Sequence, residues 1–273
     1  MADSVTVEAP AKITVGLSVF QRRADGFHDI EGIFTTISLH DTLSVSIIGG
    51  KGGDCLVDSP SLLLQKKNTF TEAYKAFCVL TGIESSVRVR VDKQIPSGGG
   101  LGGGSSDAAS FIQSIDSLFG TRLTADQLYG LALSVGSDVP FFMHALLEAG
   151  AGRQYAAYVT GRGEHVACIP PKQKLEVRLL PPGVAVSTKE AYAWLDDALS
   201  LGTVQHNAFS GKEAWMAEWE KDPGEWRFVN DFTLPVSARH EAITRAVCMM
   251  KEAGASFADM SGSGSTVFGV FSG

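Results

Sequence analysis

The residues with the clearest chemical potential form a glycine-rich loop, 96–106, with the sequence PSGGGLGGGSS. The segment 86–91 before it alternates apolar and polar residues, which predicts a strand, and the segment after it keeps helical periodicity up to Gly120. Backbone N–H groups of such a loop can converge on an anion, and the dipole of the following helix adds partial positive charge. A flexible linker would not join a patterned strand to a patterned helix, so the loop predicts a phosphate site.

Three known classes of nucleotide-binding protein do not fit this loop. The Walker A motif requires a lysine after its last glycine, and here Ser105 follows Gly104. Gly98, Gly100 and Gly103 satisfy the dinucleotide-binding pattern by letter, but no second strand ending in an acidic residue follows about 20 positions on. The His-Arg-Asp and Asp-Phe-Gly motifs of protein kinases are absent. The loop therefore indicates another kind of phosphate-binding protein.

Strands and helices are mixed along the rest of the chain. Alternation predicts strands over 5–20, 41–48, 86–91 and 175–180, and a strand–turn–strand over 257–271. Helical spacing predicts helices over 68–80, from the loop to 120, and over 125–135, 188–199 and 236–253. Asn68 is the expected N-cap and Gly82 the expected end of the first helix, and Thr124 with Gln127 forms a capping box. Because the elements do not strictly alternate, the predicted fold class is α+β.

Two stretches carry weaker patterns. Residues 145–157 are rich in alanine and glycine, which favours an exposed hairpin or an insertion. Residues 200–225 have the weak periodicity of a solvated face; for Trp215 and Trp219 in it, and for Trp226 just after it, packing is the default interpretation. We expect a domain boundary near Pro170 and Pro171, which divides the chain into domains 1–168 and 169–273.

Composition limits the class of protein. The chain has 273 residues, of which 44% are hydrophobic and 19% charged, with a formal net charge of −7. Such a charge disfavours nucleic acid as a partner, and no apolar run approaches the roughly 20 residues of a membrane span. The N-terminal residues lack the basic and apolar pattern of a leader. The four cysteines lie far apart, so we expect neither disulfide nor zinc site but a reduced cytoplasmic protein.

Three motifs together resemble one superfamily. The pattern Pro96-x-x-x-Gly100-Leu101-Gly102-x-x-x-Ser106 is similar to the central motif of the GHMP small-molecule kinases, which include galactokinase, homoserine kinase and mevalonate kinase. Residues 9–13 (APAKI) resemble the N-terminal motif of that superfamily, and residues 261–265 (SGSGS) its C-terminal glycine-rich motif. The order of the motifs also agrees. The resemblance implies an N-terminal nucleotide-binding domain like ribosomal S5 domain 2 and a ferredoxin-like C-terminal domain.

Within the superfamily, the chain resembles the kinase family that acts on 4-diphosphocytidyl-2-C-methyl-D-erythritol in the non-mevalonate isoprenoid pathway. The resemblance covers nearly the whole chain and is carried by residues 23–28, 98–109, 136–141 and 182–188. It implies ATP-dependent phosphorylation of the 2-hydroxyl of that substrate, with Mg²⁺. The family often has Asn at Thr14 and Tyr at Phe27, so these two positions depart from its pattern.

Asp138 and Lys12 are the candidate catalytic residues. A kinase acting on an alcohol must orient or deprotonate the hydroxyl, and the resemblance assigns that role to Asp138. From the local sequence alone, Asp138 could instead cap the following turn. Lys12 stands in an apolar strand, where burial is costly unless the ammonium is paired. Beside Asp138 it would keep the carboxylate ionised and lower the pKa of the substrate hydroxyl, whereas the alternative is a strand-edge lysine in solvent.

The nucleotide is expected at the glycine loop. Ser105 and Ser106 can bind a phosphate or the magnesium ion with their hydroxyls, or serve as N-caps, and the sequence identifies no other metal ligand. Asp107 suits the dipole of the first helical turn and needs no other role. The resemblance points to Asn68 and Lys93 for adenine and ribose. The complete set predicted to bind ATP is Asn68, Lys93, Pro96, Gly98, Gly99, Gly100, Leu101, Gly102, Gly103, Gly104, Ser105 and Ser106.

The cytidine end of the substrate is expected near three ring-bearing residues. Phe27 and Tyr192 offer flat faces on which a base can stack, a contact worth about 1–3 kcal/mol. His28 can donate to a cytosine edge or accept from it through either ring nitrogen. Ordinary packing is the alternative for each of the three. The complete set predicted to bind the substrate is Thr14, Phe27, His28, Asp138, Thr188 and Tyr192.

Two other functions stay open at this point. One is a different GHMP kinase, specific for homoserine or mevalonate, against which residues 25–28 and Tyr192 argue. The other is a non-catalytic nucleotide-binding regulator, against which the presence of both Lys12 and Asp138 argues. In every case the expected partner is a small molecule, with neither nucleic acid nor membrane, and the expected assembly is a monomer or a weak homodimer.

Overall fold

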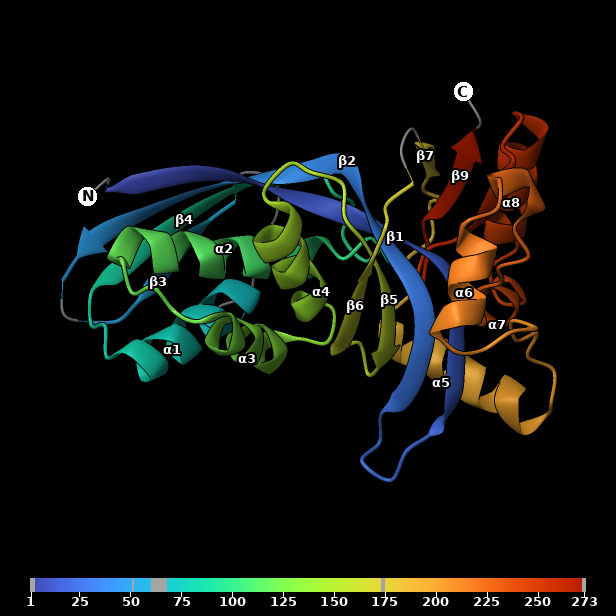
Figure 1. The fold of residues 1–273 in the computed structure, drawn as a ribbon, viewed down its shortest axis with the longest axis horizontal. Helices are drawn as coiled ribbons and strands as arrows, with labels where there is room; N and C mark the ends of the chain where they lie inside the picture. Colours follow the sequence, from blue (N-terminus) through green and yellow to red (C-terminus); the bar gives the residue numbers. More distant parts are fainter. Residues whose placement is uncertain (1–2, 51, 60–67, 173–174, 272–273) are drawn as a thin grey trace. The chain divides into compact units, whose positions relative to one another are not determined.

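The structure, a computed structural model, describes residues 3–50, 52–59, 68–172 and 175–271 (Figure 1). Strands and helices are mixed along the chain, which confirms the predicted α+β class. The chain forms two compact units, each assembled from separate segments. The first contains residues 1–11, 37–97 and 102–154, and the second 12–36, 98–101 and 155–273. The sequence predicts two consecutive domains that meet between residues 168 and 169. This domain boundary stays a prediction.

In its described residues, the first unit combines paired strands with the four α-helices α1 to α4. The C-terminal part of β2 (His28–Gly49) pairs antiparallel with β4 (Ser86–Asp92), which pairs parallel with β3 (Cys55–Asp58). The register sets Leu43 opposite Val91, and both side chains are buried, as the alternation of apolar residues predicts. The helices are α1 (Thr69–Thr81), α2 (Gly103–Phe119), α3 (Ala125–Val135) and α4 (Val139–His144). In Figure 1 they gather below β2 and β4.

The helix ends of this unit follow the predicted signals. Asn68 accepts hydrogen bonds from the amides of Phe70 and Thr71 and so caps α1, and Gly82 ends that helix in the left-handed region with φ 73°. Gly120 ends α2 in the same way. The capping box of Thr124 and Gln127 begins α3. These local signals therefore set both ends of α1, the end of α2 and the start of α3.

The second unit contains two sets of paired strands. β5 (Ala156–Gly161) pairs antiparallel with the N-terminal part of β2, from Ile30 to Thr35, and with β6 (His165–Ile169). A separate three-stranded sheet has the order β7 (Glu176–Leu180), β9 (Val267–Phe271), β8 (Phe257–Met260). Its longer helices are α5 (Thr188–Ser200), α6 (Lys212–Trp219) and α8 (Glu241–Glu252). The long strand β1 (Ser4–Arg22) pairs with β2, and both strands contribute residues to each unit.

The expected exposed hairpin at residues 145–157 is wrong. α4 continues into a π-helical turn (Ala145–Ala149), and the side chains of Ala145 and Leu146 are buried. A turn follows, and β5 begins at Ala156, whose side chain is also buried. The apolar side chains at both ends of the stretch are therefore part of the core. The alanine and glycine content alone does not predict this burial.

The single helix expected over residues 236–253 is interrupted. The structure has α7 (Thr233–Ser237) and α8, with His240 between them at φ −135° and ψ 83°, outside the helical region. The ring of His240 lies 5.6 Å from that of Trp194 on α5, and the Arg239 guanidinium lies 5.8 Å from the same ring. Contacts with another helix therefore accompany the break, and a single-helix pattern cannot reveal them.

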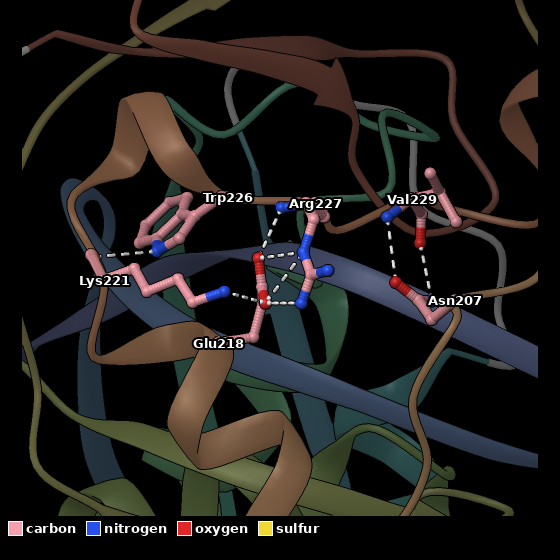
Figure 2. Close-up of polar contacts among 6 residues, drawn as sticks. All are labelled: Asn207, Glu218, Lys221, Trp226, Arg227 and Val229. Atoms are coloured by element: carbon pink, nitrogen blue, oxygen red, sulfur yellow. Dashed lines mark hydrogen bonds and ion pairs between the residues drawn. The ribbon is translucent and has the colours of Figure 1, made fainter.

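Residues 200–225 are not a purely solvated face. Trp215 and Trp219 on α6 are buried, and Trp226 stacks on Trp219 with ring centroids 5.1 Å apart, which confirms packing for all three. Figure 2 shows how polar groups hold this region: the buried carboxylate of Glu218 accepts hydrogen bonds from the Arg227 side chain (2.8 Å) and the Lys221 ammonium (2.7 Å). Burial raises the pKa of Glu218, but hydrogen bonds from Arg227 and Lys221 outweigh it and lower the pKa to about 2.

A second set of bonds in Figure 2 connects Asn207 with the backbone. Its amide group donates to the Val229 carbonyl oxygen and accepts from the Val229 N–H, both at 3.0 Å. These side-chain bonds thus help to fix the irregular stretches on either side of α6.

The four cysteines all lie among the described residues, and none of them forms a disulfide bond there. Among the residues that the structure describes, no helix is both long enough and apolar enough to cross a membrane.

Candidate active site

Ser261 is the residue at which the three predicted motifs meet. It is buried, and it follows β8 at the start of the SGSGS turn. Its hydroxyl donates to the Gly100 carbonyl oxygen (3.0 Å) and accepts from the Thr14 N–H (3.2 Å). One hydroxyl therefore joins Thr14, which directly follows the N-terminal motif, to Gly100 of the glycine loop and to the C-terminal motif; Thr14, Gly100 and Ser261 all belong to the second unit.

The backbone of the glycine loop packs directly on this turn. Gly100 has φ 73°, and a Cβ added there would lie 1.9 Å from the Ser261 carbonyl oxygen. Only glycine permits that approach. The Leu101 carbonyl accepts from the Lys12 N–H (3.0 Å), and the Gly99 carbonyl accepts from the Thr266 N–H (3.2 Å). The loop segment 98–101 is thus held between β1 and the C-terminal motif.

Lys12 is buried, with 3% of its surface exposed, so the alternative of a strand-edge lysine in solvent is wrong. Its ammonium donates to the Thr14 hydroxyl (2.8 Å) and lies 4.5 Å from the centre of the Phe34 ring. A Cβ added at Gly262 would lie 3.4 Å from Nζ, so the ammonium faces the C-terminal motif. A positive charge is therefore concentrated where the three motifs meet.

The start of α2 fits a phosphate group. Its N-cap is Gly102, with φ 71°, and no side chain caps the helix, so Ser105 and Ser106 are not N-caps. The first N–H groups of a helix have no acceptor within it and can bind an anion. The Ser106 hydroxyl is buried and has no hydrogen-bond partner among the described residues. The N–H groups and this hydroxyl are the donors that a phosphate requires.

Asp107 has a different role from the one expected, because it lies beyond the first turn of α2 and is buried. It accepts a hydrogen bond from the Lys93 ammonium (2.7 Å), which also pairs with the fully buried Asp41. The second oxygen of Asp41 accepts from the N–H groups of Gln94 (2.6 Å) and Ile95 (2.8 Å). Asp41, which sequence reasoning missed, therefore anchors the segment that leads into the glycine loop.

Burial changes the proton affinity within the triad formed by Asp41, Lys93 and Asp107. Burial raises the pKa of Asp107 from 3.8 to about 7, although the nearby Lys93 charge lowers it. Lys93 has an evident structural role as the cation between two buried carboxylates. Asn68 likewise has its role as the cap of α1. Their proposed contacts with adenine and ribose stay predictions.

Asp138 lies at the start of α4, between Gly136 and Pro140. Its backbone has φ −87° and ψ −11°, and its side chain makes no capping hydrogen bond to α4. The alternative role as a helix cap is therefore wrong. Asp138 belongs to the first unit and Lys12 to the second, so their pairing stays a prediction.

The predicted base-binding residues are held by specific neighbours. His28 is buried at the start of β2; its Nε2 lies 2.7 Å from the Asp196 carboxylate, and its ring lies 4.8 Å from that of Tyr192. Phe27 is 49% exposed, and the Arg162 guanidinium lies 4.8 Å from the centre of its ring. Sequence reasoning missed Asp196 and Arg162, which are distant in the chain from the residues that they contact.

Thr188 and Asn230 make further contacts with the C-terminal motif and its approach. Thr188, the first residue of α5, lies with its hydroxyl 3.3 Å from that of Ser263 in the C-terminal motif. The Asn230 side chain donates to the carbonyl oxygens of Met260 (2.8 Å) and Gly262 (2.7 Å), and these two bonds hold the SGSGS turn in place. Asn230 was also missed, because nothing in its local sequence separates it from an ordinary surface asparagine.

The described residues contain no group of three or more histidine, cysteine, aspartate or glutamate side chains arranged to hold a metal ion. The arrangement thus offers hydrogen-bond donors and a buried cation rather than a preformed metal cage. Such a set suits the binding of phosphate groups and the stabilisation of negative charge on them.

Comparison with protein families agrees with two of the three motifs, the glycine loop and the C-terminal motif. Residues 68–145 match the model "GHMP kinases N terminal domain", and residues 220–273 match "GHMP kinases C terminal". The first match contains the glycine loop and Asp138, and the second contains Ser261.

Individual relatives extend the similarity over almost the whole chain. The chain is 41% identical to 4-diphosphocytidyl-2-C-methyl-D-erythritol kinase of Treponema pallidum subsp. pallidum over 272 residues, 98% of this chain and 90% of that protein. It is 37% identical to the enzyme of that name from Anaeromyxobacter dehalogenans, over 97% of this chain and 80% of the relative. A crystal structure of 4-(cytidine 5'-diphospho)-2C-methyl-D-erythritol kinase is similar with a TM-score of 0.75 and 28% identity, over 97% of this chain and 90% of the other.

Proposed function

The chain belongs to the 4-diphosphocytidyl-2-C-methyl-D-erythritol kinase family of the GHMP kinases, and on that basis we propose that it phosphorylates the 2-hydroxyl of 4-diphosphocytidyl-2-C-methyl-D-erythritol with ATP. It would thereby serve the non-mevalonate pathway to isoprenoid precursors. The observation that carries the proposal is the junction at Ser261, where the three motifs of this kinase superfamily are hydrogen-bonded together beside the buried ammonium of Lys12.

Three residues have proposed roles at the reacting hydroxyl. Asp138 would accept the proton of the substrate hydroxyl or orient that hydroxyl for attack. Lys12 would keep the carboxylate ionised and favour the alkoxide, because a buried ammonium stabilises nearby negative charge. The Thr14 hydroxyl, which accepts a hydrogen bond from Lys12, would hold this ammonium in place and contact the substrate.

The phosphates of ATP would lie on the backbone N–H groups of the glycine loop and of the start of α2. Asn68 and Lys93 are proposed to contact adenine and ribose. The Ser106 hydroxyl, buried without a partner among the described residues, fits a phosphate oxygen or a ligand position of Mg²⁺, and Ser105 is the neighbouring candidate. Mg²⁺, when bound, would neutralise charge on the phosphate oxygens.

The cytidine group would bind at residues 27–28 and the start of α5. About half of the surface of Phe27 is exposed, which suits a stacking platform, and His28 and Tyr192 lie against one another. Thr188, next to the C-terminal motif, would contact the substrate between the base and the reacting hydroxyl. We further propose a cytoplasmic enzyme with domains 1–168 and 169–273, which acts as a monomer or weak homodimer without nucleic acid or membrane.

The proposal is tested by coupled ADP release from purified protein, with cytidylyl-methylerythritol, homoserine, mevalonate and galactose as acceptors. We expect turnover with the cytidylyl substrate and background rates with the other three. Turnover with homoserine or mevalonate instead would favour another GHMP kinase activity. ATP binding without turnover of any acceptor would favour a nucleotide-binding regulator.

A further inference from the structure

The His28 ring is held by α5 from two directions. Tyr192 and Asp196 are four residues apart, so they project from the same face of that helix. The Tyr192 ring packs against the His28 ring at 4.8 Å with an interplanar angle of 30°, and the Asp196 carboxylate lies 2.7 Å from Nε2. The first contact fixes the tilt of the imidazole, and the second fixes which of its edges faces the helix.

These contacts make the two ring nitrogens unequal. An ionised carboxylate only accepts hydrogen bonds, so the Nε2 that faces Asp196 carries a proton. In the neutral ring the other nitrogen, Nδ1, is then an acceptor. Among the described residues, the side-chain hydrogen bond of His28 is made by Nε2, and Nδ1 is not one of the fully buried polar atoms without a partner. The side chain is 4% exposed, so the small accessible part includes Nδ1. The acceptor is thus defined by Asp196 and left available to a ligand.

We infer that Asp196 is a positioning residue that makes the enzyme prefer cytidine over uridine by holding Nδ1 of His28 as an acceptor. The inference rests on the proposed function. At the exocyclic position cytosine presents an amino group, which donates, whereas uracil presents a carbonyl oxygen, which accepts. An Nδ1 acceptor therefore pairs with cytosine and opposes uracil, and an unpaired polar group is costly in a site that excludes water.

The next residue of the same helix supplies a matched control. Asp197 carries the same charge but is exposed on another face of α5, away from His28. Asp196→Ala and Asp197→Ala therefore change the net charge equally, and only the first removes the partner of Nε2. Asp196→Glu keeps a carboxylate on the same face and serves as the conservative variant.

The experiment measures kcat and KM for the cytidine substrate and for its uridine counterpart in the wild type and these three variants. We expect Asp196→Ala to lower the cytidine preference about tenfold, through KM rather than kcat, because it loses one selective hydrogen bond. Asp197→Ala should keep the wild-type preference, and Asp196→Glu should recover part of it. Circular dichroism establishes that each variant is folded.

Nitrogen NMR of the free enzyme, labelled at histidine and assigned with His28→Gln, supplies a readout independent of activity. We expect the proton of His28 on Nε2 in the wild type and a mixture of tautomers in Asp196→Ala. A proton on Nδ1 in the wild type, or an unchanged cytidine preference in folded Asp196→Ala, would overturn the role of Asp196. Absence of wild-type turnover with the cytidine substrate would instead overturn the proposed function on which the inference rests.

Discussion

At the scale of single residues, Lys12 shows how a charge is kept inside the protein. Burying an ammonium without compensation is strongly unfavourable. Here the Thr14 hydroxyl accepts one hydrogen bond and the Phe34 ring lies 4.5 Å away, a cation–π contact that stabilises by about 0.5–2 kcal/mol. A lysine held in this way would, in the role that we propose for it, be pre-organised for negative charge that develops during phosphoryl transfer.

The first prediction concerns Asp138 as the base. Asp138→Asn should lower kcat by about 10²–10⁴-fold, because the amide cannot accept the proton of the hydroxyl. ATP affinity, measured by calorimetry, should stay close to the wild type, since the proposed phosphate donors lie in the glycine loop. The exposed carboxylate Asp222 provides the control variant Asp222→Asn, which should keep normal turnover. A near-normal kcat in Asp138→Asn would refute the assignment.

A second prediction concerns Phe27, which is about half exposed and backed by Arg162. Phe27→Ala should raise KM for the cytidine substrate by a factor that corresponds to about 1–3 kcal/mol, with a smaller effect on kcat. Phe27→Tyr should be nearly silent, because the face that stacks is the same. Steady-state kinetics decide the point: an unchanged KM in Phe27→Ala would place the base elsewhere.

At the scale of elements, the glycine loop depends on backbone conformations that residues with a side chain rarely adopt. Gly100→Ala should destabilise the fold by roughly 1–3 kcal/mol, because it combines a positive φ with a Cβ 1.9 Å from the Ser261 carbonyl oxygen. It should also weaken ATP binding. Gly130→Ala on α3, where a Cβ would meet nothing within 4 Å, should instead stabilise by about 0.5–1 kcal/mol. Equal thermal stability of the two variants would contradict the packing described for the loop.

The sequence predicted those elements and residues whose signals are local. The cap at Asn68, the stop at Gly82 and the strand–turn–strand that contains Ser261 were all correct, because each depends on a few neighbouring residues. The partners of the site residues could not be predicted in this way. Asp41 lies 52 positions from Lys93, and Asp196 lies 168 positions from His28, so only the folded chain brings them together.

Errors in the elements have the same origin. The alanine-rich segment 145–157 was expected to be exposed, but packing buries its ends. The helix expected over 236–253 divides at His240, beside a tryptophan of another helix. Tertiary contacts override local patterns in both places.

At the scale of the whole molecule, the buried triad around Lys93 couples stability to pH. Burial raises the pKa of Asp107 from 3.8 to about 7 in the folded state, so the folded protein binds a proton more tightly than the unfolded chain does. The stabilisation that this proton provides is complete below the unfolded pKa of 3.8. It is lost as the pH rises through about 7.

The fourth prediction follows from the direction of this pKa shift. The Tm of the wild type should carry a component that falls between about pH 4 and pH 7, and Asp107→Asn should remove it, because its amide does not titrate. Asp197→Asn, on an exposed carboxylate, should leave the slope unchanged. Thermal unfolding over this range provides the comparison. Parallel Tm profiles for the wild type and Asp107→Asn would show that Asp107 does not titrate there.

The identity of the product tests the central claim most directly. The purified protein is incubated with ATP, Mg²⁺ and 4-diphosphocytidyl-2-C-methyl-D-erythritol, and the mixture is followed by phosphorus NMR. We predict a new phosphomonoester signal, assigned to the 2-hydroxyl by its coupling to the methylerythritol carbons, which grows in equal amount with ADP and is absent with Asp138→Asn. ADP formation without that phosphomonoester, or a phosphomonoester at another hydroxyl, would contradict the proposed reaction.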